Sequence, residues 1–285
     1  MLSGITNPIA LQETTGVPPE PLQTTVPGYW RELWNYRDLL ILWTLREVRI
    51  RYKQSFLGAA WAVLQPLVLM LVFTMVFSVL TRVPTGDVPY PLFCYTALLP
   101  WTFLAGAVSF AASSLINNVS LVSKVYFPRE ILPIATVGAA FVDFLVASGV
   151  FVLMLFHYGT PVSLALLWVP VLLAIQIALT LGVVLFIAAL SVRFRDVRFV
   201  VPLGLQIWMF ASPIIYPNTL VPPRLRPFFD LNPMAGIITG YRSAIIQAAA
   251  PEPGPLFAAL AISLGLLVLG YLYFKRAETS FADII

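Results

Sequence analysis

Residues 57–80 read LGAAWAVLQPLVLMLVFTMVFSVL and contain no charged side chain, and the uncharged stretch extends from Gln54 to Thr81. An α-helix rises about 1.5 Å per residue, so a run of this length can cross the ~30 Å hydrocarbon core of a membrane. Comparable apolar runs recur along most of the chain. The sequence therefore predicts an all-α integral membrane protein.

The overall composition agrees with a membrane location. Hydrophobic residues make up 59% of the chain and charged residues 11%, whereas a soluble protein carries about 25% charged residues. The net charge of +4 would also suit a nucleic-acid-binding protein. In a membrane protein, however, Lys and Arg gather in cytoplasmic loops and interact with anionic lipid head groups. We therefore expect membrane lipids, and no nucleic acid, as partners.

The chain holds a single cysteine, Cys94, and a single histidine, His157. An internal disulfide, a Cys- or His-based metal site and a Ser-His-Asp triad are therefore not expected. The sequence also lacks the G-x-x-x-x-G-K-[ST] motif that cradles nucleotide phosphates. We expect no catalytic residue, and no metal or other cofactor bound by this chain.

Two segments precede the first apolar run. Residues 1–28 are rich in Pro and Thr and lack the basic start and apolar core of a signal peptide, which predicts a flexible cytoplasmic tail. Residues 29–55 predict an amphipathic helix on the membrane surface, because apolar and basic side chains recur on neighbouring helical faces. The apolar face holds Trp30, Trp34, Ile41, Leu45, Val48 and Tyr52, and the basic side chains include Arg46, Arg49 and Lys53.

Residues 56–285 form the expected transmembrane domain. Proline, glycine and charged residues interrupt its apolar sequence and divide it into six predicted spans. These spans cover about 57–80, 92–117, 132–157, 165–191, 200–217 and 255–274.

Basic residues orient the predicted bundle. If both termini are cytoplasmic, the inner segments hold 13 of the 17 Lys and Arg residues, with six before residue 56, two in 118–130, three in 193–198 and two in 275–276. The outer segments hold the other four. Because cytoplasmic loops are enriched in Lys and Arg, both termini are predicted to be cytoplasmic.

The segment between the last two spans contains an apolar piece of its own, at about 220–250. Asn232 suits a helix cap and Pro233 suits the first helical position, so a helix is predicted to begin there. Arg242 in its middle argues against a crossing of the bilayer. We therefore expect short re-entrant helices at the outer surface, since irregular backbone at membrane depth needs cover from protein or water.

Other candidate residues lie within or near the ends of the spans. Asp143 is the only acidic residue in the predicted spans, so it should face the bundle interior, either as a structural hydrogen-bond acceptor or along a substrate path. Aromatic rings near span ends belong to the interfacial belt or, in a pore for sugars, stack on the apolar faces of pyranoses. The aromatic candidates are Trp61, Trp101, Phe103, Tyr216 and Tyr241.

Three stretches together resemble the permease subunit of the ABC-2 exporter family, in the branch that exports polysaccharides (O-antigen or capsule) and teichoic acid. They are RYKQSFLG at 51–58, NVSLVSKVYFPREILP at 118–133, and the segment from Leu231-Asn232-Pro233-Met234 to Tyr241-Arg242. The resemblance implies six spans, a permease homodimer, and two copies of a separate cytoplasmic ABC ATPase that binds ATP and Mg.

The resemblance also implies roles for residues. On composition alone, the loop at 123–130 is either a polar connector or a docking element, and the loop at 193–198 is either an anchor against lipid phosphates or a second docking contact. The resemblance implies that both loops couple the ATPase to the spans and that 220–250 forms the outer gate. The implied coupling residues are Lys124, Tyr126, Phe127, Pro128, Arg129, Glu130, Arg193, Arg195 and Asp196. The candidate channel and gate residues are Trp61, Trp101, Phe103, Asp143, Tyr216, Asn232, Pro233, Tyr241 and Arg242.

The function implied by the resemblance is export of a lipid-linked polysaccharide such as O-antigen across the cytoplasmic (inner) membrane. A wall teichoic acid exporter is the alternative within the same branch. An ABC-2 exporter of drugs or lipids fits the loop at 123–130 less well. A membrane-embedded transferase would need several polar catalytic residues at one membrane face, and the sequence offers only scattered ones.

Overall fold

The computed structural model describes residues 35–53, 55–86, 88–124 and 127–281, and within these ranges it is helical without strands. The predicted all-α fold is confirmed. The longer helices are α2 (Arg37–Tyr52), α3 (Ala60–Phe73), α4 (Tyr90–Ser114), α6 (Ile131–His157), α7 (Trp168–Arg193), α8 (Val197–Phe210), α10 (Pro233–Ile245) and α11 (Pro253–Glu278). The shorter ones are η1 (Thr74–Leu80), η2 (Ile116–Asn118), α5 (Val119–Lys124), η3 (Leu164–Leu167), η4 (Asn218–Leu220) and α9 (Arg226–Asp230).

Five helical segments in the described ranges are long and apolar enough to cross a membrane. They correspond to the first four predicted spans and to the last one. The remaining predicted span, at about 200–217, differs: α8 has 14 residues, or about 21 Å, which is shorter than the hydrocarbon core. The structure therefore does not by itself establish the predicted count of six.

Prolines explain why α8 stops early. Pro213 and Pro217 follow its last turn, and the residue before a proline is displaced from helical geometry. The Ser212 hydroxyl donates to the Trp208 carbonyl at 2.8 Å and so satisfies one group of the last turn. The chain then continues as turns and the short helices η4 and α9 before α10 begins.

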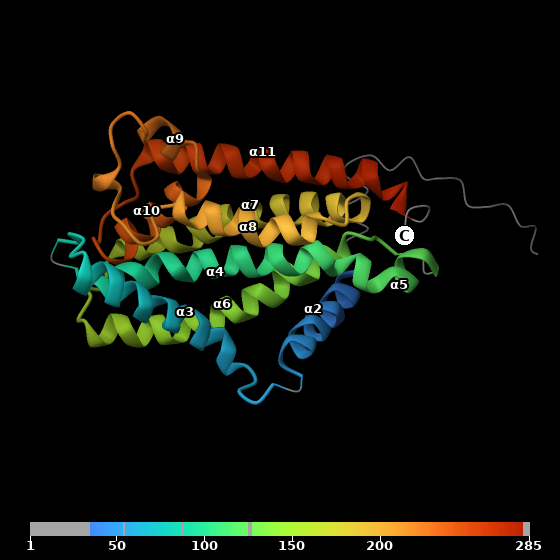
Figure 1. The fold of residues 1–285 in the computed structure, drawn as a ribbon, viewed down its shortest axis with the longest axis horizontal. Coiled ribbons are helices and arrows are strands. Elements are labelled where there is room, and N and C mark those ends of the chain that lie inside the picture. The colour runs from blue at the N-terminus through green and yellow to red at the C-terminus, as the bar shows by residue number, and fades with distance from the viewer. Residues whose placement is uncertain (1–34, 54, 87, 125–126, 282–285) are drawn as a thin grey trace, which may run out of the picture.

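Helix α4 is the centre of the bundle. Of its most apolar window, 78% is buried inside the protein, compared with 17% for α3 and for α11. In Figure 1, α4 runs through the middle of the molecule, with α3 and α6 on one side and α7 and α8 on the other. Cys94 lies on this helix and is completely enclosed. The other apolar helices therefore present more of their side chains at the surface of the bundle.

Glycines bring helices into close backbone contact. A Cβ atom on Gly270 of α11 would lie 2.2 Å from the carbonyl oxygen of Gly182 on α7. In α10, a Cβ atom on Gly236 would lie 2.5 Å from the Pro255 carbonyl oxygen, and one on Gly240 would lie 2.6 Å from Leu172. Small residues allow such approaches within membranes. The G-x-x-x-G spacing of α10 therefore packs this helix against both α11 and α7.

Helix α2 carries two different faces. Ile41 and Leu45 are exposed, as expected for a helix whose apolar stripe meets lipid. On another face, Thr44 packs against Gly138 of α6, where an added Cβ atom would approach the threonine side chain to 2.8 Å. Arg49 and Lys53 are exposed. Of the predicted interface helix, Trp30 and Trp34 lie outside the described residues, as does the predicted tail.

Candidate functional site

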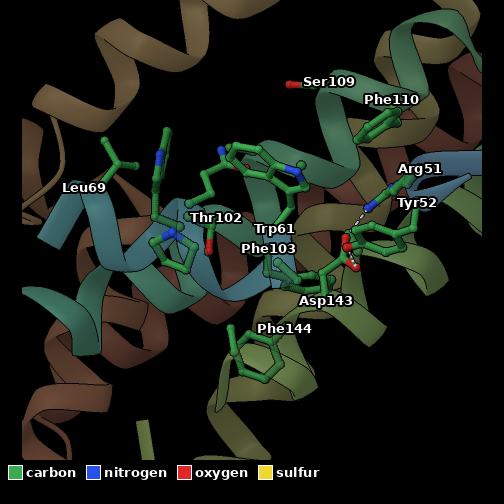
Figure 2. A pocket seen from close by; sticks show the side chains of 18 residues that line it. Arg51, Tyr52, Trp61, Leu69, Thr102, Phe103, Ser109, Phe110, Asp143 and Phe144 are labelled. Atoms are coloured by element: carbon green, nitrogen blue, oxygen red, sulfur yellow. Dashed lines mark hydrogen bonds and ion pairs between the residues drawn. The ribbon is translucent and has the colours of Figure 1, made fainter. Parts of the chain in front are cut away.

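A cavity of about 360 Å³ opens between α2, α3, α4 and α6. Four of the predicted channel residues line it together, namely Trp61, Trp101, Phe103 and Asp143. Figure 2 shows Trp61, Phe103 and Asp143 around one space, with Arg51 and Tyr52 of α2 beside Asp143 of α6 at one end. Sequence positions from 51 to 147 thus contribute to a single site.

The aromatic residues of this cavity differ in accessibility. Trp61 is 52% exposed, whereas Trp101 is 4% exposed. Trp101 packs edge-on against Trp208 of α8, with 6.0 Å between ring centroids. Phe103 is enclosed and packs against Phe144. Trp61 is therefore the ring that a flat apolar ligand surface could reach, and the other two form the wall behind it.

Asp143 has two partners from the end of α2. Arg51 forms an ion pair with one carboxylate oxygen, and the Tyr52 hydroxyl donates a hydrogen bond to the other. The Arg51 guanidinium also lies 3.9 Å from the centre of the Phe110 ring. This arrangement connects the interface helix to α6 and places a polar group inside the apolar bundle.

Arg51 is nearly enclosed, with 6% of its side chain exposed, and its Nε–H has no hydrogen-bond acceptor in the described part of the chain. Burial and then the hydrogen bond to Asp143 raise the pKa of the Tyr52 phenol above its usual value. The phenol is therefore protonated at neutral pH and acts as a donor. Sequence reasoning did not select Arg51 as a site residue, although one carboxylate in a span calls for a cationic partner.

The predicted gate residue Arg242 belongs to α10, and its side chain reaches the non-helical residues 211–217, which we call the break after α8. It is 6% exposed, and its Nη atoms donate to the carbonyls of Pro213 at 2.6 Å and Ile214 at 2.8 Å. The same guanidinium reaches the carbonyl of Phe93 at 3.3 Å and lies 3.5 Å from the centre of that ring. Arg242 therefore satisfies carbonyls that the broken helix leaves without intrahelical partners.

Asn232, the residue before α10, also forms hydrogen bonds with residues at the end of α8 and in the break. Its side-chain oxygen accepts from the Met234 N–H at 3.1 Å, which confirms the predicted helix cap with Pro233 at the first helical position. The same oxygen accepts from Trp208 Nε1 at 2.9 Å. Its amide nitrogen donates to Ser212 Oγ at 2.9 Å. Since Trp208 also contacts Trp101, the break and the aromatic cavity share a wall.

The two predicted tyrosines do not join the cavity. The Tyr216 hydroxyl donates to the Phe210 carbonyl at 2.9 Å and so belongs to the break after α8. Tyr241 is buried, and its hydroxyl donates to the Gln176 side-chain oxygen at 3.1 Å. These contacts give both side chains structural partners, and a direct role in gating stays a prediction.

At the opposite end of the bundle, the turn before α6 is tied to the end of α11. Glu130 is 1% exposed, and its carboxylate lies 2.8 Å from Lys275 Nζ. Lys275 also pairs with Glu278 at 3.0 Å, and Arg129 donates to the Glu278 carbonyl at 2.6 Å. Burial raises the pKa of the Glu130 carboxyl, while the Lys275 charge opposes this effect.

The remaining coupling candidates of this loop lie near the turn or outside the residues that the structure describes. Phe127 and Pro128 are buried, so they face the protein. Lys124 ends α5, but its side chain and all of Tyr126 are outside the described positions. Sequence reasoning missed Lys275 and Glu278, whose signal was a pair of opposite charges one helical turn apart at the end of the last span.

The other predicted coupling loop lies at the same end of the molecule. Arg193, Arg195 and Asp196 connect α7 to α8 and are exposed. Arg193 lines a cavity of about 320 Å³ together with Tyr273 and Arg276 of α11. The predicted cytoplasmic charges therefore gather at one end, and the break after α8 lies at the other (Figure 1).

A bundle with five helices that are long and apolar enough to cross a membrane, in the described part of the chain, is typical of an integral membrane protein, and an internal cavity with polar and aromatic lining suits one that transports a ligand. Residues 38–246 match the family of ABC-2 type transporters. The chain belongs to this family.

Similar proteins cover nearly the whole chain. The O-antigen export system permease protein RfbA of Myxococcus xanthus is 33% identical, over 90% of this chain and 98% of its own length. A protein of the same description from Klebsiella pneumoniae is 29% identical over 87% of this chain and 95% of its own. The polysialic acid transport protein KpsM of Escherichia coli is 23% identical over 82% and 91%, respectively.

Proposed function

We propose that this chain is the permease subunit of an ATP-driven exporter that moves a lipid-linked polysaccharide of the O-antigen class across the cytoplasmic membrane. The observation that carries the proposal is the 33% identity to an O-antigen export permease over 98% of that protein. The relatives with 28–33% identity share that description. Their names favour a polysaccharide cargo over a polyol phosphate.

The internal cavity supports a carbohydrate cargo. Trp61 presents an accessible ring in a space of about 360 Å³ that also exposes the polar side chains of Gln65, Thr102 and Ser109. Flat rings stack on the apolar faces of sugars while polar groups meet the hydroxyls. Such contacts must be weak enough for the polymer to move from one position to the next.

The proposed complex contains two copies of this chain and two copies of a cytoplasmic ABC ATPase. Basic residues from three separate segments lie at the end of the bundle that carries the turn at 127–130. The preference for positive charge on the cytoplasmic side therefore supports cytoplasmic termini. The exposed arginines of the α7–α8 connection suit a contact with a soluble partner at that side.

Deletion of the gene in its own organism tests the cargo. We expect loss of a surface polysaccharide and accumulation of the same glycan on its lipid carrier inside the cell, with recovery from a plasmid copy. Purification of the tagged chain should also recover an ABC ATPase in equal amount. Unchanged surface polysaccharide in the deletion strain would contradict the proposal.

A pair of variants tests the cavity. Trp61→Ala removes the accessible ring, and we expect export to fall several-fold while the amount of protein in the membrane stays normal. Phe156→Ala is the matched control, since Phe156 is 75% exposed at the far end of α6 and is not among the residues that line this cavity. Equal export by the two variants would remove Trp61 from the path.

A further inference from the structure

The cytoplasmic turn and the end of α11 form a compact unit, which we call the latch and define as Arg129, Glu130, Lys275 and Glu278. Three polar contacts of 3.0 Å or less join these residues. The Arg129 backbone N–H adds a longer contact of 3.4 Å to Glu278 Oε1. The residues of the turn and of α11 are separated by 145 to 149 positions in the sequence.

Apolar side chains back the latch. Phe274 is completely buried and packs edge-on against Phe281, with 5.5 Å between ring centroids. Both rings belong to one buried cluster with Phe127 and Ile131, which flank the turn on either side. The latch is therefore a packed joint with a charged centre, and the turn cannot shift on its own without exposing apolar surface.

A second contact ties the preceding segment to the interface helix. Arg46 of α2 donates to the Asn118 side-chain oxygen at 3.1 Å, and its guanidinium stacks on Trp43 at 4.2 Å. Asn118 ends η2, which leads into α5 and the turn. The interface helix holds one side of this loop, and α11 holds the other.

We propose that the latch carries the motion of the coupling turn into α11, so that Lys275 and Glu278 are positioning residues for coupling although they lie outside the turn itself. This inference rests on the proposed function. A displaced turn would pull on α11 through the Glu130–Lys275 pair, because Glu130 is 1% exposed and separation would leave its buried carboxylate without the Lys275 cation. An ATPase stroke at the turn thereby moves the last span as well as α6.

The first experiment loosens the latch. The double variant Lys275→Ala with Glu278→Ala removes both side-chain partners from α11. In vesicles that contain the complete complex with its ATPase, we expect ATP hydrolysis to stay within twofold of the wild type while polysaccharide export falls at least fivefold. The readout is the ratio of glycan exported to ATP hydrolysed, which a general loss of folded protein would leave unchanged.

Arg276→Ala is the matched control for charge. Arg276 is the next residue on the same helix, and its side chain is exposed. Under the latch proposal this variant keeps the wild-type coupling ratio. If Arg276→Ala lowers the ratio as much as Lys275→Ala alone, a simple loss of positive charge explains the effect and the proposal is overturned.

A rescue experiment separates positioning from folding. In a Cys94→Ala background that exports like the wild type, cysteines replace Glu130 and Lys275, and a short bis-methanethiosulfonate reagent then joins them in the space that the longer Glu and Lys side chains filled. We expect the cysteine pair to uncouple export, the linker to restore it, and a reducing agent to abolish it again. Export that stays lost after complete linking would overturn the proposal.

Failure of the latch and failure of the proposed function give different results. If wild-type vesicles export no polysaccharide with ATP, the proposed function fails. If wild-type vesicles export and the loosened variant exports with the same ratio, the latch fails and the function stands.

Discussion

At the end of the bundle that we propose to be the outer one, Arg242 donates to main-chain carbonyls that follow α8, whereas at the proposed cytoplasmic end Lys275 pairs with side-chain carboxylates. Both cations are far from full exposure, at 6% for the Arg242 residue and 20% for the Lys275 side chain. Arg242 donates to two main-chain carbonyls that lie just after the end of α8. Lys275 instead joins two segments that lie 145 positions apart in the sequence, through the nearly enclosed carboxylate of Glu130 and the partly exposed carboxylate of Glu278.

The two ends of the bundle therefore respond differently to the loss of one side chain. At the outer end, a missing donor leaves several buried carbonyls without partners, and the cost falls on folding. At the cytoplasmic end, a missing partner loosens a joint near water, and the cost falls on coupling.

Arg242→Ala should have the largest effect. Its removal leaves the carbonyls of Pro213 and Ile214 without this donor, and each buried unsatisfied group costs about 1–3 kcal/mol. We expect a loss of about 3 kcal/mol or more, seen as a lower midpoint of thermal unfolding in detergent and less monodisperse protein. Arg224→Ala, at an exposed position of the same segment, should match the wild type. An unchanged midpoint for Arg242→Ala would contradict the claim that Arg242 stabilises the fold.

Asp143→Asn tests the ion pair of Asp143 with Arg51, which lies midway between the two ends of the bundle. Arg51 would lose its anion while it stays enclosed, and breaking a buried pair costs about 3–5 kcal/mol. Because Asp143 is 24% exposed, we expect a smaller loss of about 2 kcal/mol in thermal or denaturant unfolding. The double variant Asp143→Leu with Arg51→Met should lose less than Asp143→Asn. A larger loss in the double variant would show that packing, and not charge, holds α2 to α6.

Asn232→Ala should have an intermediate effect. The variant removes the cap of α10 and the acceptor for Trp208, and loss of a cap costs about 1 kcal/mol. We expect a destabilisation of about 1–2 kcal/mol in the same unfolding assay. Asn218→Ala is the control, because Asn218 makes one exposed hydrogen bond to Thr239. Equal effects in the two variants would argue against a special role for the break.

Arg195→Ala should leave stability unchanged. Its side chain is exposed in the α7–α8 connection, and surface charges contribute little to folding. We expect the same unfolding midpoint as the wild type and weaker recovery of the ATPase when the tagged chain is purified. A lower midpoint with normal ATPase recovery would assign Arg195 to the fold.

The sequence predicted the long spans well because they are long. An uncharged run of some twenty residues has few alternatives to a membrane helix, and α6 begins and ends within one residue of its predicted bounds. The span at 200–217 was less well predicted, because average hydropathy conceals a single break. Pro213 and Pro217 carried that signal, and their local geometry outweighs the apolar side chains around them.

The partners of the charged residues were beyond sequence reasoning. Asp143 meets Arg51 across 92 positions, and Glu130 meets Lys275 across 145. No local periodicity links such distant residues, since the contacts depend on how whole helices pack. Four of the aromatic and acidic channel candidates did converge on one cavity. Tyr241 did not, because Gln176 gives its hydroxyl a partner on another side of α4.

The glycine contact between α7 and α11 has a mechanical consequence. With Gly182 and Gly270 interlocked at the backbone, neighbouring side chains would collide if either helix slid along the other. The two helices therefore move together as one rigid unit. At the end of this unit that is far from Lys275, Gly236 and Gly240 of α10 contact α11 and α7. A displacement of α11 near Lys275 would therefore carry α7 with it and reach the contacts with α10 at the other end of the bundle.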